Sequence, residues 1–435
     1  MLRSYRLGLS LASLSLLFAA ACDDGSVGPT RPDGGDPPDD VDGGMTSGEV
    51  TYHEHLRPVL VENCTMCHRD GGIAPFALET YEQASEVAER MADVTAARVM
   101  PPFLADNSGE CNTWSNHRGL TEGEIQLFAD WVAMGRLEGD PSTPEPEPAE
   151  LPALDSVDVT LELPVTYEID ESDNDDYRCF VVDPELDADT FVTGYDVHPG
   201  NPERVHHVIV YNPTNADEAA EAIALDEADG TPGDGYPCFG GPRVQAPPMV
   251  LWAPGAGATR FPRGTGIAMN EGVAQVIQVH YNNLVPDSPG TDKTTIDLST
   301  RSTANQAYIA PLLDSDLNLP PRQEEVVESN TISFSGFGIP TSVRVWGAFP
   351  HMHTLGRQLR VDIGRADGSD QCLIDVPRWD FNWQLAYWLD EPITVSPDDS
   401  ATITCTYNTM ERDETVHWGD GTLDEMCLNF VYVTL

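Results

Sequence analysis

Residues 346–356 read WGAFPHMHTLG, and they combine a β-strand pattern with two closely spaced histidines. Apolar residues alternate on both sides of this stretch, at Val343, Val345, Leu359 and Val361. The alternation predicts a strand that continues beyond a short break. Since residues i and i+2 of an extended chain point to the same face, His351 and His353 can present two imidazoles to one metal ion. The alternative interpretation is two unrelated histidines at the end of a strand.

The first 22 residues have the pattern of an export signal. Arg3 and Arg6 precede a short apolar run from Leu9 to Phe18, and three alanines then lead directly to Cys22. This pattern predicts a bacterial lipoprotein signal in which Cys22 is lipidated and becomes the first mature residue. An ordinary signal peptide or an anchor helix is the alternative, but the apolar run is too short to span a bilayer. We therefore expect an exported protein, lipid-anchored to the bacterial cell envelope on its periplasmic or outer-membrane side, under oxidising conditions.

The charge of the chain restricts its partners. It has 72 acidic and 23 basic residues, a formal net charge of −49. This excess argues against nucleic acid or an anionic membrane surface as a partner, so we expect membrane contact through the lipid anchor alone. Residues 23–48 are rich in Asp, Gly and Pro and predict a disordered tether. Residues 140–155 contain an acidic, proline-rich linker.

Residues 64–68 read Cys-Thr-Met-Cys-His, the attachment signature of a c-type haem. In such a site both thiols form thioethers to the porphyrin, and the histidine is an axial ligand of the iron. A thioredoxin-like pair would not need His68, and no βαβ pattern surrounds the motif. A zinc knuckle would need a second ligand pair, and none follows. We predict one covalent c-type haem held by Cys64, Cys67 and His68.

The second axial ligand is expected downstream of this motif. A helix is predicted at 80–97, and the proline-rich loop after it contains Met100. A methionine opposite a histidine is the arrangement of cytochromes c, so Met100 is the predicted ligand and His117 is the alternative. Met91 and Met134 fall within helical patterns and are expected in the core.

Residues 49–139 form a segment that resembles a class I cytochrome c. A helix is predicted to run up to Cys64, and Thr121 with Glu124 forms a capping box for a last helix at 125–134. We assign the segment to a small all-α haem domain.

The chain after the linker has a different character. Short β-branched runs recur between clusters of Gly, Pro and Asp, at 157–163, 191–197, 205–211 and 273–281, and the only helical candidate is 216–224. This spacing predicts β-sandwiches or jelly rolls, and the length is sufficient for two. The predicted fold is therefore mainly β. Two tandem jelly-roll/β-sandwich domains, 156–310 and 311–435, follow the small all-α domain.

Further histidines occur on the predicted strands. His206 and His207 are adjacent at the start of one strand, and neighbours on a regular strand face opposite ways. Sharing one metal ion would require a bulge or the strand end. Gln278 and His280 lie on one face of a later strand, and Met426 occurs close to the C-terminus.

Together these motifs resemble the copper type II ascorbate-dependent monooxygenases, a family that includes dopamine β-monooxygenase and peptidylglycine α-hydroxylating monooxygenase. The matching elements, in the family's order, are His206-His207, Gln278-Val279-His280, His351-Met352-His353, Cys405 to Thr409 and Asp424 to Cys427. The resemblance covers about residues 160–435.

The resemblance implies two copper ions. The electron-transfer copper would be held by His206, His207 and His280. The catalytic copper would be held by His351, His353 and Met426. Imidazole binds both valences of copper, whereas a soft thioether favours Cu(I), the form that must meet O₂. Gln278 would orient a ligand or hold a water molecule beside the first ion.

Six cysteines lie outside the signal and the haem motif: Cys111, Cys179, Cys238, Cys372, Cys405 and Cys427. Their even number predicts disulfides but permits 15 pairings. The resemblance implies one between Cys405 and Cys427, next to Met426. We pair Cys179 with Cys238 as a conjecture and leave the other two unassigned. His198 and His417 match no ligand of the family and are expected to be structural.

Two departures from the family concern the substrate. Peptide-amidating members carry an arginine two residues before the first histidine of the His-x-His motif, and this position is Phe349 here. The tyrosine four residues after the methionine is Phe430 here. The clamp for a peptide carboxylate is therefore missing.

We expect a copper-dependent monooxygenase that hydroxylates a C–H bond of a small organic substrate with O₂. Its electrons would come from an ascorbate-like donor or a periplasmic redox protein and pass through the fused haem. The alternatives are a non-catalytic copper and haem electron-transfer lipoprotein, and a lectin-like jelly roll with incidental histidines.

Overall fold

The structure is a computed structural model that describes residues 48–435 except 73, 148–151, 231–232, 284–289 and 338–340. The predicted lipoprotein signal, with Cys22, and nearly all of the predicted tether lie outside the described residues. Residues 49–435 form one compact unit. Within the described part of the chain, no helix is long and apolar enough to cross a membrane.

The segment before the linker is helical, as predicted. It contains η1 (Tyr52–Leu56), α1 (Arg57–Asn63), α2 (Tyr81–Glu86), α3 (Ala88–Ala96) and α4 (Glu122–Ala133). Its core is built from the apolar faces of these helices, with Leu56, Leu60, Phe128 and Trp131 almost completely buried. The predicted capping box of the last helix is present, since the Thr121 hydroxyl accepts from the Glu124 N–H and Glu124 accepts from the Thr121 N–H.

One helix prediction in this segment was wrong. The single helix expected at 80–97 is divided into α2 and α3 at Val87, whose backbone leaves the helical region at φ −113° and ψ 16°. No glycine or proline occurs between Tyr81 and Ala96. The break therefore has no local cause that the sequence displays.

The first part of the β region contains both predicted kinds of element. The helix is α5 (Ala216–Asp229), and the strands are β1 (Val159–Glu162), β2 (Tyr167–Glu168), β3 (Asp175–Val182), β4 (Thr190–His198), β5 (Val205–Tyr211), β6 (Tyr236–Pro237), β7 (Pro248–Trp252), β8 (Thr259–Arg260), β9 (Thr265–Met269), β10 (Gln275–Asn282), β11 (Thr291–Asp292) and β12 (Thr295–Arg301). One sheet has the order β6-β3-β10-β5-β7, and β1, β12, β4 and β9 lie side by side in another. Tyr195 of β4 and Ile277 of β10 belong to the same buried cluster, so the core lies between the two sheets.

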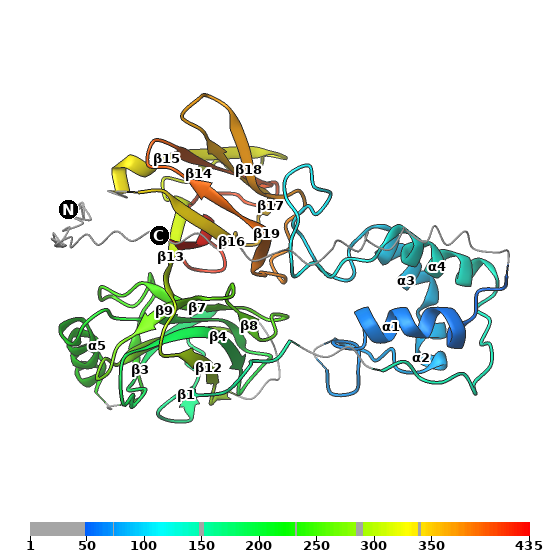
Figure 1. Ribbon diagram of the computed structural model, residues 1–435, viewed down its shortest axis with the longest axis horizontal. Coiled ribbons are helices and arrows are strands. Elements are labelled where there is room, and N and C mark those ends of the chain that lie inside the picture. The colour runs from blue at the N-terminus through cyan, green and yellow to red at the C-terminus, as the bar shows by residue number, and fades with distance from the viewer. Residues whose placement is uncertain (1–47, 73, 148–151, 231–232, 284–289, 338–340) are drawn as a thin grey trace, which may run out of the picture. The chain divides into compact units, whose positions relative to one another are not determined.

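The second part of the β region is also built from two sheets (Figure 1). Its elements are β13 (Asn305–Asp314), β14 (Asn318–Leu319), β15 (Val326–Ser333), η2 (Phe334–Phe337), β16 (Val343–His351), β17 (Gly356–Gly364), β18 (Asp370–Val376), β19 (Tyr387–Val395), β20 (Ser400–Tyr407), β21 (Val416–His417) and β22 (Cys427–Thr434). A four-stranded sheet has the order β15-β20-β17-β18. The order β13-β22-β16-β19 continues the second sheet of the first part through a parallel pair between β13 and β9. The mainly-β prediction is confirmed, and the boundary predicted after residue 310 falls inside β13.

The strand predicted to continue through residues 346–356 is in fact two strands. β16 pairs with β22 and β19, whereas β17 pairs with β20 and β18 in the other sheet. The chain therefore crosses between sheets at Met352 to Leu355. At Gly356 an added Cβ would lie 2.8 Å from Trp379 and 2.9 Å from Met352, so the crossing requires glycine there.

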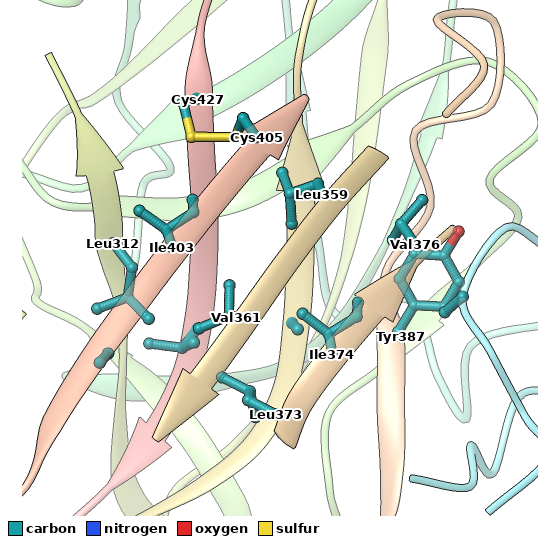
Figure 2. Packing of buried hydrophobic residues seen from close by; sticks show 14 of the residues in the cluster. Leu312, Leu359, Val361, Leu373, Ile374, Val376, Tyr387, Ile403, Cys405 and Cys427 are labelled. Atoms are coloured by element: carbon teal, nitrogen blue, oxygen red, sulfur yellow. A yellow bond between two sulfur atoms is a disulfide. The ribbon is translucent and has the colours of Figure 1, made fainter. Parts of the chain in front are cut away.

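Three disulfides connect the six described cysteines outside the Cys-x-x-Cys-His motif. Cys405–Cys427 links β20 to the start of β22, as the family resemblance implied (Figure 2). Cys179–Cys238 is also present. The third, Cys111–Cys372, links the helical segment to β18 across 261 residues.

The core of the second part should tolerate truncation poorly. Leu359 is fully buried between the sheets with Val361, Ile374 and Ile403 (Figure 2). Replacing Leu359 by alanine removes buried apolar surface and leaves a cavity, so we expect Leu359→Ala to lower the free energy of unfolding by about 2–5 kcal/mol. Urea denaturation followed by tryptophan fluorescence measures the change.

The matched control is Val327→Ala on β15, because the Val327 side chain is 55% exposed. This variant should change the free energy of unfolding by at most about 0.5 kcal/mol. Equal losses in the two variants would contradict the position of the core.

Candidate metal centres

Two strands of the first part bring three histidines together. β10 pairs antiparallel with β5, and His280 lies opposite His207. The next pair is Tyr281 with Val205, so His206 is an extra residue on β5, a β-bulge. Adjacent residues on a regular strand face opposite ways, so His206 and His207 could share one metal ion only at a bulge or a strand end. The ligand nitrogens of His206, His207 and His280 all lie within 4.8 Å of one another.

The chemistry of this cluster fits a metal ion. His206 Nδ1 is buried and has no hydrogen-bond partner. Burial, followed by the neighbouring histidines, lowers the pKa of His206 to about 3 and holds the pKa of His207 well below its usual value. Both imidazoles are therefore neutral at neutral pH, which is the form that binds a metal ion. Three neutral imidazoles suit copper in either valence.

Asp175, at the start of β3, holds His280 in place. His280 Nε2 lies 2.8 Å from Asp175 Oδ1, and His280 Nδ1 lies 3.3 Å from His207 Nδ1. Burial raises the pKa of Asp175, but hydrogen bonds from His280 and Thr422 outweigh this effect and lower it to about 2. The carboxylate fixes the tautomer of His280, so Nδ1 is the nitrogen that faces the other two histidines.

Gln278 hydrogen-bonds beside a disulfide. Its side-chain amide donates to the Cys238 carbonyl at 3.1 Å, beside the Cys179–Cys238 disulfide. Within the described residues, the side chain that orients His280 is Asp175, whose carboxylate accepts the hydrogen bond. Sequence reasoning missed Asp175, because an aspartate within an acidic run carries no distinguishing pattern. The role expected for Gln278 beside the metal ion stays a prediction.

His351 and His353 form a second cluster where the chain leaves β16. Their ring centroids are 5.1 Å apart. His351 Nδ1 contacts Gln384 Oε1 at 2.5 Å, and His353 Nδ1 contacts the Asp424 carbonyl at 3.1 Å. Each histidine therefore has Nε2 left for a metal ion. Burial lowers the pKa of His351 to about 3 and that of His353 to about 4, so both rings are neutral.

Met426 lies close to His353 along the backbone. His351 pairs with Leu428, two residues after Met426, across the antiparallel β16 and β22. The residue before Met426, Glu425, is fully buried. Its carboxylate accepts the backbone N–H groups of His353 at 3.0 Å and Met426 at 3.2 Å. Two imidazoles and one thioether form a donor set that fits Cu(I).

The two clusters are neighbours. The ring centroids of His207 and His351 are 6.3 Å apart. Phe381 stacks on His206 at 4.5 Å with an interplanar angle of 20°, and its ring centroid is 6.2 Å from that of His353. An aromatic side chain thus contacts one histidine of each cluster. The rings of His198 and His417 have other partners, Asp297 for the former and the Leu317 carbonyl for the latter.

Comparison with known proteins agrees with this geometry. The N-terminal domain of the copper type II ascorbate-dependent monooxygenases matches residues 164–287, and their C-terminal domain matches residues 309–433. Each matched range contains one of the two sets of candidate copper ligands. The chain belongs to the copper type II ascorbate-dependent monooxygenase family. It is thus a copper-dependent monooxygenase, and the family is a two-copper, ascorbate-using one.

Similar proteins include animal hydroxylases. The chain is 26% identical to a tyramine beta-hydroxylase of Caenorhabditis briggsae over 90% of its own length and 68% of that protein. It is 26% identical to the dopamine beta-hydroxylase of Rattus norvegicus over 74% of its own length and 50% of that protein. A DBH-like monooxygenase protein 1 of Gallus gallus is 25% identical over 42% of this chain and 32% of that protein. The chain thus spans about half the length of the rat enzyme.

A third cluster lies in the helical segment, outside both matched ranges of the family. Cys64, Cys67, His68 and Met100 line one cavity. His68 Nδ1 lies 3.1 Å from the Phe76 carbonyl, which leaves Nε2 for a ligand bond. His117 does not line this cavity; it lies in a neighbouring one, with its ring 4.8 Å from that of Phe103.

The two thiols of this cavity fit haem attachment better than a redox pair. Cys64 and Cys67 are both free, whereas the other described cysteines form disulfides. Burial raises the pKa of Cys64 to about 12 and also raises that of Cys67. A reactive Cys-x-x-Cys pair instead has a lowered thiol pKa. The residues present fit a c-type haem, which Cys64 and Cys67 would attach and His68 and Met100 would bind at the iron.

The contact between Asp175 and His280 predicts that copper affinity falls when the Asp175 side chain is removed. Removing a carboxylate that orients a metal-binding histidine costs about 10–100-fold in affinity, so we expect this loss in Asp175→Ala. Copper binding to the full chain is measured by competition with a chelator of known affinity. Asp297→Ala is the control, because Asp297 holds the exposed His198 and no histidine of either cluster. Unchanged affinity in Asp175→Ala would show that His280 needs no such support.

Proposed function

We propose that this protein hydroxylates a C–H bond of a small organic substrate with O₂ and takes the electrons through a c-type haem carried on the same chain. The overall reaction is R–H + O₂ + 2 e⁻ + 2 H⁺ → R–OH + H₂O. The observation that carries the proposal is that the two sets of candidate copper ligands are neighbours. The ring centroids of His207 and His351 are 6.3 Å apart.

The proposed roles of the two copper sites follow from their ligand atoms. His351, His353 and Met426 would hold the catalytic copper, and His206, His207 and His280 would hold the copper that stores an electron. Bound copper supplies the one-electron redox chemistry and the reaction with O₂. The chain's own residues hold the ligands at fixed atoms: Gln384 on His351, the Asp424 carbonyl on His353, and Asp175 on His280.

The haem-binding residues support a tethered electron donor. Cys64, Cys67, His68 and Met100 would hold a haem within the compact unit that also contains both copper clusters. A donor on the same chain acts at high effective concentration, so it can replace a diffusible reductant at this step. We propose that an ascorbate-like donor or a periplasmic redox protein reduces the haem. The protein would be exported and lipid-anchored through Cys22.

The surroundings of the second cluster favour an apolar or aromatic substrate. Phe349 and Phe430 lie opposite each other on β16 and β22, two residues along each strand from the pair of His351 with Leu428. Phe349 is buried and meets Trp388 edge to face at 5.4 Å. Two phenyl rings cannot form the ion pair that recognises a carboxylate. We therefore propose that the substrate is a small aromatic compound without a carboxylate and not a peptide. The names of the tyramine and dopamine hydroxylases suggest an amine of this kind.

The two copper sites should be separable by mutation at Met426. Met426→Ala should retain reducible copper at the three histidines but lose O₂-dependent hydroxylation, because it removes the only thioether of the second donor set. Product is measured with tyramine and dopamine as test substrates and ascorbate as reductant, and copper by electron paramagnetic resonance. Met410→Ala, at a side chain that is 40% exposed, is the control. Hydroxylation that survives in Met426→Ala would show that Met426 is not a ligand of the catalytic copper, whereas a native chain that forms no product would favour the non-catalytic electron-transfer lipoprotein.

The haem proposal predicts the spectrum of Met100→His. This variant should keep covalent haem but lower its reduction potential, since a methionine ligand raises the potential. It should also lose the weak sulfur-to-iron absorption of the oxidised form. Met91→Leu is the control, because Met91 lines the same cavity and is expected to be a core residue only. If the absorption persists in Met100→His and disappears in Met91→Leu, the axial ligand is Met91 and the assignment is wrong.

A further inference from the structure

A single loop touches both copper clusters and the cavity of the haem-binding residues. It connects β18 to β19, and its residues 379–384 read WDFNWQ. We refer to residues 379–384 as the connecting segment. Neither the haem motif nor the copper motifs contain any of its residues.

On the copper side, three residues of the connecting segment contact ligands. Phe381 stacks on His206 at 4.5 Å. Gln384 Oε1 lies 2.5 Å from His351 Nδ1. The Trp379 indole N–H donates to the His353 carbonyl at 3.1 Å.

On the other side, Trp383 lines the cavity that contains Cys64, Cys67, His68 and Met100. Gly255 lines the same cavity and lies against the indole. An added Cβ at Gly255 would lie 2.6 Å from Trp383 Cζ3, and the Gly255 φ of +84° already disfavours any side chain. Glycine at this position leaves the space that the Trp383 ring occupies.

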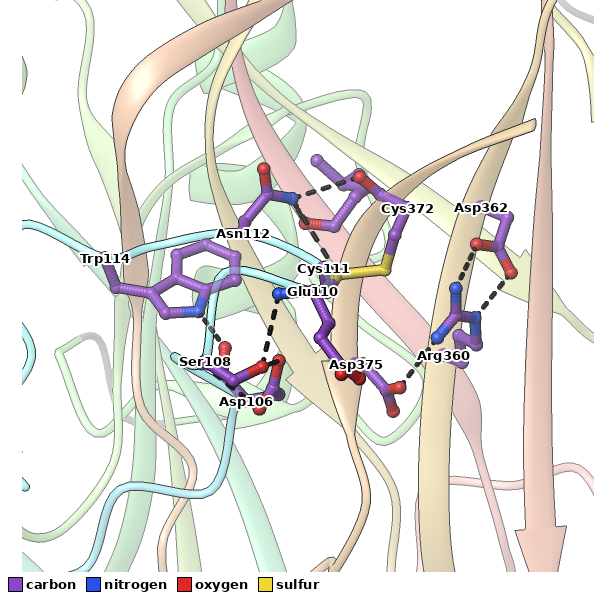
Figure 3. A network of polar contacts seen from close by, with 11 residues as sticks. Asp106, Ser108, Glu110, Cys111, Asn112, Trp114, Arg360, Asp362, Cys372 and Asp375 are labelled. Atoms are coloured by element: carbon purple, nitrogen blue, oxygen red, sulfur yellow. Dashed lines mark hydrogen bonds and ion pairs between the residues drawn. A yellow bond between two sulfur atoms is a disulfide. The ribbon is translucent and has the colours of Figure 1, made fainter. Parts of the chain in front are cut away.

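The cavity is held against the connecting segment by the loop between α3 and α4. The Cys111–Cys372 disulfide and the Asn112 side chain, which donates to the carbonyls of Cys372 and Leu373, attach this loop to β18 (Figure 3). Asn116 attaches it to β19 by accepting the Trp388 N–H and donating to the Ala386 carbonyl. Both strands that carry the connecting segment are therefore bound to the haem-binding part of the chain.

We propose that Trp383 is the side chain through which electrons leave the haem, and that the connecting segment carries them to the copper ligands. The inference rests on the proposed function, because it requires a haem in the cavity. Each transfer oxidises one Fe(II) haem to Fe(III) and reduces one Cu(II) to Cu(I). An external one-electron donor, of the ascorbate or redox-protein class, then restores the Fe(II) haem.

The bonded route is short. Trp383 and Gln384 are consecutive, so the path runs from the indole through one peptide bond to the Gln384 side chain and across its hydrogen bond to His351. The Gln384 amide also donates to the Phe381 carbonyl at 2.9 Å, which connects the same path to the ring on His206. Covalent and hydrogen bonds couple an electron donor to its acceptor better than empty space does, so this segment is the favoured route among the contacts described.

The test measures electron transfer without substrate or O₂. The haem of the full chain, loaded with haem and oxidised copper, is reduced by an anaerobic laser flash, and its reoxidation is followed by absorbance. In Trp383→Leu we expect reoxidation to slow by about tenfold, equivalent to about 1.4 kcal/mol. Trp383→Phe, which keeps an aromatic ring and most of the packing, should give an intermediate rate. Trp346→Leu, at a tryptophan that does not line the cavity, should react at the native rate.

Haem content, copper content and haem reduction potential are measured in each variant, and rates are compared at equal driving force. Native rates in both Trp383 variants would overturn the inference. If Trp383→Leu does not fold, the rate of Trp383→Phe against the native chain decides. A native chain that binds no haem, or whose haem is never reoxidised by its own copper, refutes the proposed function itself, whatever the variants do.

Discussion

The geometry of the second copper cluster depends on one buried carboxylate. Glu425 is fully buried and accepts the backbone N–H groups of His353, Leu355 and Met426. Burial raises its pKa to about 7, although these three donors favour the charged form. Hydrogen bonds to a charged group contribute about 1.5–3 kcal/mol each, and a buried acceptor left without them is costly. The carboxylate thereby joins the sheet crossing after β16 to the residues before β22. One side chain holds the backbone of both His353 and Met426, two predicted copper ligands.

The same principle recurs at the other ligands. A metal-binding imidazole has two nitrogens, and an acceptor on one of them decides which nitrogen is free. Asp175, Gln384 and the Asp424 carbonyl perform this task for His280, His351 and His353. His206 differs, because a phenyl ring covers it and its Nδ1 has no partner. Three of the histidines are thus oriented before a metal ion binds, which reduces the cost of ordering them.

The helical segment is attached to the second β part by direct contacts in addition to the linker. Trp114 is buried in the core of the second β part and forms an antiparallel bridge with Leu389 of β19. Its indole N–H donates to the Asp106 carbonyl (Figure 3). Together with the Cys111–Cys372 disulfide, these contacts hold the loop between α3 and α4 on the copper-binding domain. This attachment would fix the distance between the haem-binding residues and the copper clusters, on which the rate of the proposed electron transfer depends.

The sequence alone singled out the candidate ligands of the metal ions and the haem, because their patterns are local. Each motif can be recognised within a few consecutive residues. This holds for Cys-x-x-Cys-His, for the histidines at i and i+2, and for the adjacent histidines that required a bulge. The mainly-β character of the chain after the linker, four of its strands and most helices were predictable for the same reason, since their periodicity is short. Tertiary structure alone decided which polar residues orient the ligands. Asp175, Gln384 and Glu425 are residue types found throughout an acidic chain, and they become partners only when β3, the connecting segment and β22 meet. The crossing of residues 352–355 between two sheets, the Cys111–Cys372 disulfide and the place of Trp383 have the same origin. Contacts between distant segments depend on strand register and packing, and no local pattern encodes them.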